Sequence, residues 1–323
     1  MVTSQQLYLP ITGDMQVVDR VIREQLHSDV ILIRQVAEYI IHSGGKRLRP
    51  ALVLYAARAC GYEGTHHCDL AVAVEFIHTA TLLHDDVVDE SELRRNNPTA
   101  NTLFGNAAAV LVGDFLYTRA FQLMVGVNQM RVLQVMADAT NIIAEGEVLQ
   151  LMNCHDASVD IDGYLQVIHY KTAKLFEAST RLGAIISGVN AQQEQALATY
   201  GMHLGTAFQI IDDVLDYSSE EAKTGKHLGD DLAEGKPTLP LILVMQRGNP
   251  QQVQCVRHAI EEGGRDSFPE VLTAIMSTDT LSAAREYAQT EAQQAITAIE
   301  QLPASLFRDT LIELAHFAVK RDH

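Results

Sequence analysis

The sequence of 323 residues has no tryptophan and only four cysteines, and no two cysteines form a C-x-x-C pair. This spacing signals neither a zinc ribbon nor a disulfide framework. Basic residues are also scarce: 24 lysines and arginines stand against 41 aspartates and glutamates, so the formal net charge is -17. A chain this acidic repels nucleic acid and anionic lipid unless its cations gather locally. Any anionic ligand therefore needs a local basic site or a metal ion.

The chain also starts without a basic segment followed by an apolar one, and we expect no apolar run as long as a membrane span. A cytoplasmic protein is the resulting expectation. His66, His67 and Cys68, in the stretch THHCD, could suggest a metal site. Because adjacent residues point in different directions on a helix, we instead expect a loop or surface segment there.

Period-two alternation and hairpin turns such as Asn-Gly between apolar runs are missing, so the sequence does not indicate a sheet. Apolar residues recur every three or four positions instead, as at Ile33, Val36, Ala37, Ile40 and Ile41. This is the period of a helix. Breaks rich in glycine and proline separate roughly ten or more helices, and none is long enough to be an interdomain linker. The pattern predicts one all-α domain over residues 1–323.

Two clusters of three aspartates interrupt apolar stretches: Asp85, Asp86 and Asp89 in LLHDDVVDES, and Asp212, Asp213 and Asp216 in FQIIDDVLDY. On a helix, positions i and i+4 share a face, so each cluster converges its carboxylates. Buried, unpaired carboxylates would become protonated or would destabilise the fold, so cations must lie nearby. Oxygen ligands without thiols favour Mg²⁺, which commonly also binds water and phosphate. One such cluster alone could be an acidic helix end, but a second copy argues against that.

The few basic residues lie beside glycines and aspartates. They occur at Lys46, Arg47 and Arg49, at Arg94 and Arg95, at Lys171 and Lys174, and at Lys226 and Lys236. Each alone could be a solvated surface charge, but guanidinium pairs and lysines together suit a diphosphate. His78 lies two turns before Asp85 on the same stripe, so it would face the same ligand. Alone, it would more often be a core histidine.

In order and over essentially the full chain, these motifs resemble those of the trans-isoprenyl diphosphate synthases, or polyprenyl synthetases. The matching blocks are GGKRLRP, LLHDDVVDESELRR, GDFLYTRAF, KTAKLFEAS, GTAFQIIDDVLDY and GDDLAEGKPTLPL. The resemblance implies a large helical bundle around a central cavity, a homodimer and Mg²⁺ as cofactor. It also implies transfer of isopentenyl diphosphate to an allylic diphosphate such as farnesyl diphosphate. Within the family, the chain is similar to the bacterial members that make the ubiquinone side chain.

The resemblance implies a role for each motif residue. The six aspartates of the two clusters would hold Mg²⁺ on the allylic diphosphate. Isopentenyl diphosphate would be bound by Lys46, Arg49, His78 and Arg95, and the allylic substrate by Arg94, Lys171, Thr172, Gln209, Lys226 and Lys236. Of these, Lys171, Thr172, Gln209 and Lys226 are expected to act in catalysis. Asp230 and Asp231 would orient metal-bound water. The departing diphosphate can accept the proton, so no dedicated protein base is required.

Other functions remain open at this point. Di-iron proteins carry Glu-x-x-His motifs, and EFIH and ELAH fit, but EQLH is a third match, so the pattern is not selective. Class I terpene cyclases share an aspartate-rich motif, but their second metal motif mixes Asn, Ser and Glu. A non-catalytic partner subunit would normally have lost aspartates. Among synthases, the product could have nine or ten units, or could be geranylgeranyl diphosphate.

The residues before the first aspartates bear on product length. Thr81 lies one turn before Asp85 and Ala80 is its neighbour, and both are small, which leaves the upper cavity open. Deeper along the path, Met124 is a candidate floor and Met136 a further one, although ordinary core packing explains either methionine equally well. We therefore hypothesise a long-chain product of eight units.

This hypothesis predicts that Ala80→Phe or Thr81→Tyr shortens the product, because an aromatic ring would close the cavity early. Chromatography of the products of the purified variants measures this. Unchanged product length in both variants would contradict the proposed path. A wild-type enzyme that stops at farnesyl or geranylgeranyl diphosphate would contradict the long product.

Overall fold

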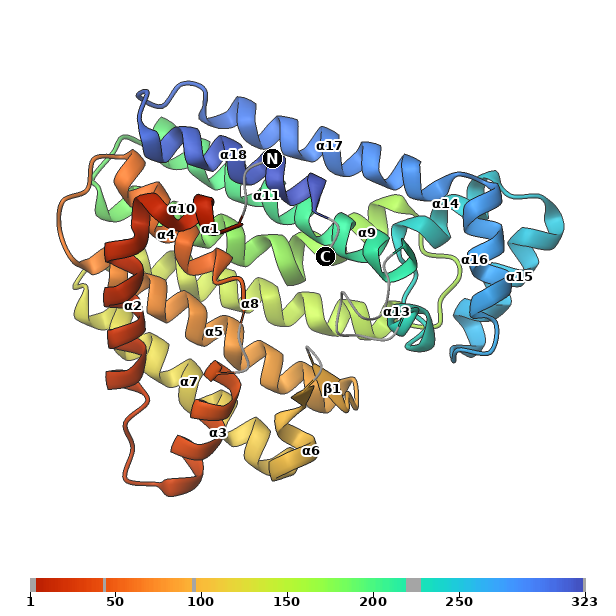
Figure 1. Ribbon diagram of the computed structural model, residues 1–323, viewed down its shortest axis with the longest axis horizontal. Coiled ribbons are helices and arrows are strands. Elements are labelled where there is room, and N and C mark those ends of the chain that lie inside the picture. Colours follow the sequence, from red (N-terminus) through yellow and green to blue (C-terminus); the bar gives the residue numbers. More distant parts are fainter. Residues whose placement is uncertain (1–3, 43–44, 95–96, 219–227, 322–323) are drawn as a thin grey trace. The chain divides into compact units, whose positions relative to one another are not determined.

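The computed structural model describes residues 4–42, 45–94, 97–218 and 228–321. The described chain is helical almost throughout, which confirms the all-α prediction (Figure 1). Its first half contains α1 (Ser4–Tyr8), η1 (Leu9–Ile11), α2 (Thr12–Gln25), α3 (Ile31–His42), α4 (Leu48–Ala59), α5 (His66–Val88), β1 (Leu93–Arg94), β2 (Asn97–Pro98), α6 (Ala100–Phe104), α7 (Asn106–Gly126) and α8 (Met130–Asn153). Its second half contains α9 (Ile161–Ile168), η2 (His169–Ala173), α10 (Lys174–Ile186), α11 (Ala191–Ser218), α13 (Asp230–Ala233), α14 (Leu239–Arg247), α15 (Pro250–Glu262), α16 (Phe268–Ser277), α17 (Thr280–Ile299) and α18 (Leu306–Lys320).

Two compact units can be distinguished, and each is assembled from several stretches of the chain. Unit 1 comprises Met1–Ala139, Leu175–Gly201 and Ala298–Leu314, and unit 2 comprises Thr140–Lys174, Met202–Thr297 and Ala315–His323. The boundaries fall inside the helices α8, α10, α11, α17 and α18 rather than in loops. Neither unit is therefore continuous in sequence, and a single domain over residues 1–323 stays a prediction.

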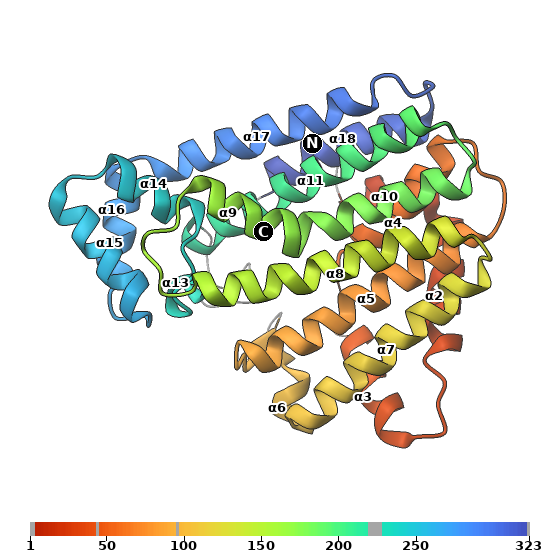
Figure 2. The ribbon, with the colours of Figure 1, turned by 180° about the vertical axis from the view of Figure 1, so that it is seen from behind.

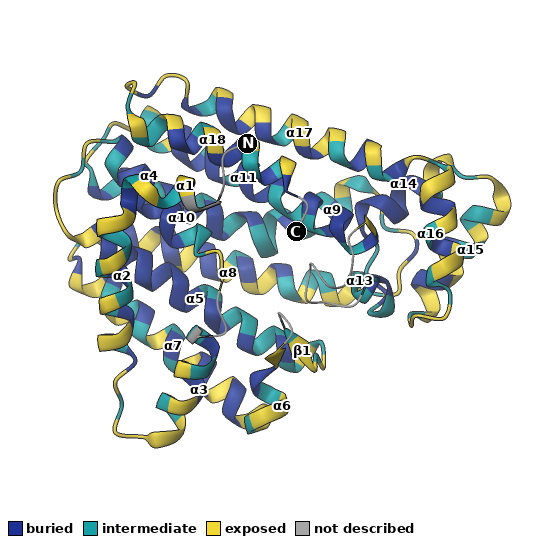
Figure 3. Ribbon diagram, viewed as in Figure 1, coloured by how far each residue is buried: buried dark blue, intermediate teal, exposed yellow. Residues whose placement is uncertain are grey.

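Unit 1 is organised around α5, which packs against α2, α4 and α7. Its residues are apolar on nearly every side, and Phe76, Ile77 and Leu83 are fully buried. A helix that is apolar all round is stable only when neighbouring helices surround it. Figure 2 shows α5 and α7 side by side, and Figure 3 shows how completely α5 is buried along most of its length. This burial determines the surroundings of every functional side chain that α5 carries.

The helix α7 corrects one expectation from the sequence. Its 21 residues make it long and apolar enough to cross a membrane by length and composition, whereas we expected no such run. Of its most apolar window, 39% is buried inside the structure. Because α5 packs along α7, contact with α5 accounts for the buried part of its apolar residues, while Leu111 and Val125 are exposed.

The strands β1 and β2 were also not expected. They form a two-stranded antiparallel ladder in which Leu93 pairs with Pro98 and Arg94 with Asn97. A ladder this short leaves the fold class unchanged. Its effect is local, because it turns the chain back immediately after the first aspartate cluster.

Unit 2 contains two apolar clusters of its own. The first joins α9, α11, α14 and α17 through residues such as Tyr164, Ile211 and Ala284. The second packs α15 and α16 against α14 and includes the buried residues Val256, Ile260 and Ile275. Both clusters contact the last part of α11, which carries the second aspartate cluster, through residues from Ile210 to Tyr217.

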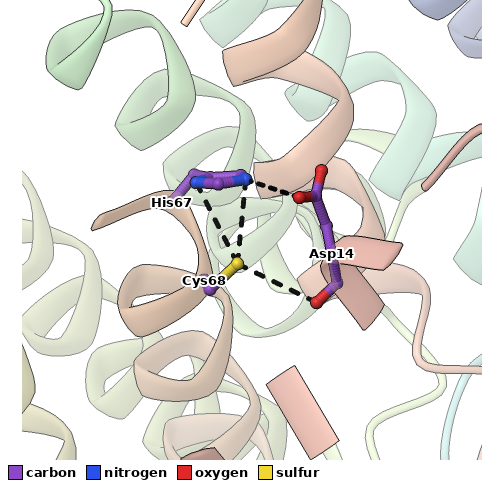
Figure 4. A group of neighbouring side chains, drawn as sticks. All are labelled: Asp14, His67 and Cys68. Atoms are coloured by element: carbon purple, nitrogen blue, oxygen red, sulfur yellow. Dashed lines mark hydrogen bonds and ion pairs between the residues drawn. The ribbon is translucent and has the colours of Figure 1, made fainter. Parts of the chain in front are cut away.

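The stretch THHCD lies in a helix and not in a loop, so that expectation was wrong. The helix α5 begins at His66, and the side chains of His67 and Cys68 are buried. Figure 4 shows them turned toward Asp14 of α2, with His67 Nε2 at 3.1 Å from Asp14 Oδ1 and at 3.7 Å from Cys68 Sγ. Neighbouring side chains diverge on a helix, but here both reach the facing helix because α2 packs close to α5.

The cluster of Asp14, His67 and Cys68 brings three potential metal ligands within 4.8 Å of one another. Both oxygens of Asp14 are already bound by Arg58 of α4, through Nε at 2.9 Å and Nη2 at 2.6 Å. A divalent cation would have to compete with this guanidinium at the same carboxylate. Burial also raises the pKa of the Cys68 thiol to about 12, so the thiol is protonated. We interpret the cluster as a clamp that joins α2, α4 and α5.

The clamp predicts that Asp14→Asn destabilises the protein by about 2 kcal/mol at pH 7, because it leaves Arg58 without its anion. Burial alone would raise the pKa of Asp14, but hydrogen bonds from Arg58 and His67 outweigh it and lower the pKa below 3.8. A carboxyl with a lowered pKa stabilises the fold above its unfolded pKa, and this contribution is lost as the pH falls through the folded pKa. The difference between wild type and variant should therefore shrink in strong acid.

Urea unfolding at pH 7 and below pH 4 measures this difference. Asp19→Asn on the same helix is the matched control, because Asp19 forms no ion pair with any residue that the structure describes. Equal stability of the two variants at pH 7 would show that the clamp contributes nothing.

Candidate functional site

The first aspartate cluster lies at the carboxyl end of α5. Asp85 and Asp86 belong to its last turn, and Asp89 caps the helix with its backbone N–H donating to the Asp85 carbonyl at 2.8 Å. Asp89 thus follows Asp85 by one turn as predicted, although it is outside the helix. The carboxyl end of a helix disfavours negative charge, so the helix itself adds to the cost of this cluster. A cation at this end would remove that cost.

Asp86 is completely buried, which adds to the free-energy cost of a negative charge at this end of α5. Arg94, on β1, binds its Oδ1 through Nη2 at 2.7 Å and Nε at 2.9 Å. Its Oδ2 is also buried and has no hydrogen-bond partner in the described part of the chain. A buried carboxylate oxygen without a partner is unusual and fits a cation that completes its coordination.

The basic residues of unit 1 are placed by α4 and α5. Arg49 Nη1 lies 3.0 Å from His78 Nε2, and because a guanidinium only donates, this nitrogen of His78 accepts. The guanidinium carbon of Arg49 also lies 4.6 Å from the centre of the Phe176 ring. Lys46 is exposed just before α4. Three of the four residues predicted for isopentenyl diphosphate are thus described, while Arg95 falls outside the described residues.

The second aspartate cluster lies near the carboxyl end of α11, in unit 2. Asp212 and Asp216 are one turn apart and partly exposed, whereas Asp213 is buried between two donors. Tyr164 donates its hydroxyl to Asp213 Oδ2 at 2.6 Å, and Gln209 Nε2 donates to Oδ1 at 2.8 Å. Gln209 in turn accepts from Thr172 Oγ1 at 3.0 Å. Three residues predicted from the sequence are therefore joined in one chain of hydrogen bonds.

Asp213 is costly to ionise in this environment. Burial, followed by the negative charge of Asp231, raises its pKa to about 8 despite the donors Tyr164 and Gln209. Without a cation, Asp213 is therefore largely protonated at neutral pH. A bound cation stabilises the carboxylate form, so the residues present fit a metal that carboxylate oxygens prefer.

Lys171 and Thr172 lie on η2, a π-helical turn within the otherwise α-helical segment from α9 to α10. Such turns place side chains out of α-helical register and are frequent at functional sites. Lys171 Nζ bonds Glu147 Oε2 of α8 at 2.5 Å. Gly146, the neighbour of Glu147, lets the backbone of α8 approach the backbone of η2 closely. A Cβ atom at position 146 would lie 2.6 Å from the backbone nitrogen of Lys171.

The remaining residues that were predicted for the site come after α11 in the sequence. Asp231, on α13, donates its backbone N–H to Asp216 Oδ2 at 3.3 Å, and Lys236 N–H donates to the Asp231 carbonyl at 2.9 Å. Asp230 is bound by Arg265, so it is part of an ion pair. Lys226 falls outside the described residues.

Three residues that contact the predicted site were missed by the sequence analysis. Tyr164 donates to Asp213, Glu147 binds Lys171, and Arg321 Nη2 lies 2.7 Å from Asp212 Oδ1. Arg321 also stacks on Phe208, with 3.7 Å between the guanidinium carbon and the ring centre. Each lies on a different element from its partner, so no spacing along the chain could have signalled the pair. For Glu147, the neighbouring Gly146 within a helix was an available signal of close approach.

The residues predicted to determine chain length all lie in unit 1. Ala80 is buried, and Thr81 donates its hydroxyl to the His78 carbonyl of its own helix at 2.8 Å. Met124 of α7 and Met136 of α8 are fully buried. Their role in chain length stays a prediction.

The sequence pattern of the polyprenyl synthetase family matches residues 30–276. The chain belongs to the polyprenyl synthetase family. This synthetase is 54% identical over 310 residues to the octaprenyl diphosphate synthase of Escherichia coli (strain K12), with 96% of each chain covered. It is 44% identical to the all-trans-nonaprenyl-diphosphate synthase (geranyl-diphosphate specific) of Rhodobacter capsulatus, with 98% of each chain covered.

A solved structure shows the same fold. The polyprenyl synthase from Caulobacter crescentus CB15, complexed with calcium and isoprenyl diphosphate, matches with a TM-score of 0.96 and 45% identity, covering 99% of this chain and 98% of that one. The synthetase is therefore an all-α prenyltransferase of a family that depends on divalent metals. This confirms the fold class and the reaction class inferred from the motifs, and it removes the di-iron alternative.

The close contact at Gly146 generates a prediction. Gly146→Ala should reduce turnover by about tenfold or more, because the added methyl group must push η2 away from α8 and so move Lys171 and Thr172. Steady-state kinetics measure the effect, and circular dichroism checks that the helices remain. Gly163→Ala in α9 is the matched control, since its Cβ would meet its nearest neighbours at 3.4 Å. Similar turnover in both variants would contradict the positioning role of this contact.

Proposed function

We propose that the synthetase makes octaprenyl diphosphate for the ubiquinone side chain by adding isopentenyl diphosphate units to farnesyl diphosphate, with Mg²⁺ as cofactor. The observation that carries this proposal is the 54% identity to an octaprenyl diphosphate synthase over 96% of both chains. The motif residues support it, because the chain has both aspartate clusters and the basic residues beside them. The number of isoprene units in the product is a separate part of the proposal, because the relative that is 44% identical is a nonaprenyl synthase.

The aspartates would hold the metal. Asp85, Asp86 and Asp89 offer one set of oxygens, and Asp212, Asp213 and Asp216 offer the other. As the resemblance to the family implies, each set would hold Mg²⁺ on an allylic diphosphate. When bound, Mg²⁺ supplies Lewis-acid stabilisation of the diphosphate leaving group. Tyr164 and Gln209 are hydrogen-bonded to Asp213, so its carboxyl group is already oriented before the metal and the substrate bind.

Lys171, Thr172 and Gln209 would serve the reacting end of the allylic substrate. The hydroxyl of Thr172 is oriented by its bond to Gln209, and the oxygens of both can face developing positive charge. Lys171 is held by Glu147 and can donate its further hydrogens to the diphosphate. Lys226 and Lys236 would add positive charge, as the resemblance implies. The departing diphosphate can accept the proton that the intermediate loses. These residues therefore need only to position the substrate and to stabilise the charges that develop on it.

Lys46, Arg49, His78 and Arg95 would bind isopentenyl diphosphate, while Arg94 joins the first aspartate cluster to the allylic diphosphate. The contact of Arg49 with His78 and with the Phe176 ring limits its movement, which lowers the entropy lost when it binds a phosphate. We further propose one domain, a homodimer and a cytoplasmic enzyme, on the resemblance to the family. Nothing in its charge favours nucleic acid as a partner.

Incubating the purified protein with labelled isopentenyl diphosphate, farnesyl diphosphate and Mg²⁺ tests the proposal. We expect incorporation that chelation by EDTA abolishes, and a product of eight units on chromatography. No incorporation would indicate a partner subunit, and hydrocarbon formed from farnesyl diphosphate alone would indicate a cyclase. A product of nine or ten units would contradict the proposed length only.

Asp85→Asn and Asp212→Asn should each lower turnover by about a thousandfold, because each removes one charged metal ligand. Asp19→Asn, on a helix that carries no predicted site residue, serves as the control with unchanged turnover. Equal turnover of all three variants would refute the assignment of the aspartates.

A further inference from the structure

The turn that carries Lys46 and Arg49 contains a backbone conformation that arginine rarely adopts. Arg47, between them, has φ 47° and ψ 34°, in the left-handed region. Residues other than glycine disfavour this region, and they keep this conformation only where the surrounding structure holds them in it. The helix α4 begins at the next residue, Leu48. The direction in which α4 presents Arg49 therefore depends on this turn.

Glu75 of α5 holds the side chain of Arg47. Its Oε1 lies 3.5 Å from Arg47 Nε, and the Glu75 side chain is only 12% exposed. Among the residues that the structure describes, Arg47 has no other ion-pair partner, and its buried Nη1 has no hydrogen-bond partner. The Arg47 side chain is 19% exposed, and a largely buried guanidinium that loses its anion is unfavourable, so this pair restrains the turn.

The same stretch of α5 also contacts Arg49. His78 follows Glu75 by three positions, which places both on one side of the helix. Glu75 thus binds Arg47 while His78 binds Arg49 at 3.0 Å. Two consecutive contacts from one rigid helix determine how the start of α4 is oriented.

Tyr8 of α1 restrains the backbone immediately before the turn, because its hydroxyl donates to the Lys46 carbonyl. Tyr55 of α4 donates in turn to the carbonyl of Leu7, the neighbour of Tyr8. Burial and the nearby charge of Glu75 raise the pKa of Tyr8, so its hydroxyl remains a donor at any ordinary pH. The turn is held at its side chain by Glu75 and at its backbone by Tyr8.

We propose that Glu75, together with Tyr8, is a positioning residue for isopentenyl diphosphate: it holds Arg47 in the left-handed turn and thereby places Lys46 and Arg49. This inference rests on the proposed function of those two residues. Glu75 itself touches no substrate in this account. The negative charge of Glu75 lies close to the proposed site for isopentenyl diphosphate and would repel this anion. Holding Arg47 in place must therefore favour binding by more than this repulsion disfavours it.

That repulsion makes the proposal sharply testable. If Glu75 acted only through its charge, Glu75→Gln would strengthen diphosphate binding and lower the KM for isopentenyl diphosphate. A positioning role requires the opposite sign. We expect Glu75→Gln to raise this KM about tenfold and to leave the KM for farnesyl diphosphate within about twofold of wild type. Tyr8→Phe should raise the KM for isopentenyl diphosphate about threefold.

Asp14→Asn separates positioning from general destabilisation. Asp14 and Arg58 form another partly buried ion pair in the same unit, away from the turn, so this variant should lower the melting temperature without changing either KM. Initial rates with each substrate varied in turn, together with thermal unfolding, give both quantities for all three variants. A rise in the KM for isopentenyl diphosphate in Asp14→Asn equal to that in Glu75→Gln would overturn the proposal.

A glycine at position 47 provides a rescue. Glycine adopts the left-handed conformation without strain, so Arg47→Gly should form the turn without an ion pair. Adding Glu75→Gln to that variant should then change the KM for isopentenyl diphosphate by less than about twofold. An unchanged or lower KM in Glu75→Gln alone, or the full effect in the Arg47→Gly background, would refute the proposal. Wild-type enzyme that incorporates no isopentenyl diphosphate would refute the proposed function instead.

Discussion

The structure depends on carboxylates that are buried before any cation is bound to them. Asp86 is fully buried with one oxygen lacking a partner, and burial raises the pKa of Asp213 to about 8. Well-packed apolar residues would avoid both costs. The fold instead supplies partial compensation, through Arg94 in unit 1 and through Tyr164 and Gln209 in unit 2. This leaves each cluster short of positive charge, which favours the binding of a divalent metal.

The compensating donors also orient the carboxylates, and this explains why they lie on several elements. Tyr164 comes from α9, Gln209 from α11 and Thr172 from η2, and together they hold one buried aspartate. In unit 1, α4 and α5 hold Arg49 and His78 together in a similar way. Side chains that are already held in place lose less conformational entropy when a ligand binds them, so the helices that hold these groups would strengthen binding without contacting the ligand.

The sequence indicated the fold class and the family, but not the contacts that hold the predicted site residues in place. Helical periodicity predicted the all-α fold, and six motif blocks along the chain gave the family resemblance, because each of these signals is local. Tyr164 and Arg321 gave no such signal, and Glu147 gave only the indirect one of its neighbour Gly146, since each meets its partner only after distant segments pack. The same limit explains why THHCD was wrongly expected on the surface: its burial depends on α2 packing against the start of α5.

Backbone geometry is the other part that local patterns could not reveal. Arg47 adopts a left-handed conformation although arginine carries no preference for it, and η2 departs from α-helical register within an apparently ordinary helical segment. Gly146 is needed where α8 meets that turn, because any side chain there would meet backbone atoms that cannot move cheaply. Each of these irregular positions lies next to a residue that is predicted to bind a diphosphate. Regular helices present side chains only at fixed intervals, so placing a side chain between those intervals requires a departure from regularity at that point.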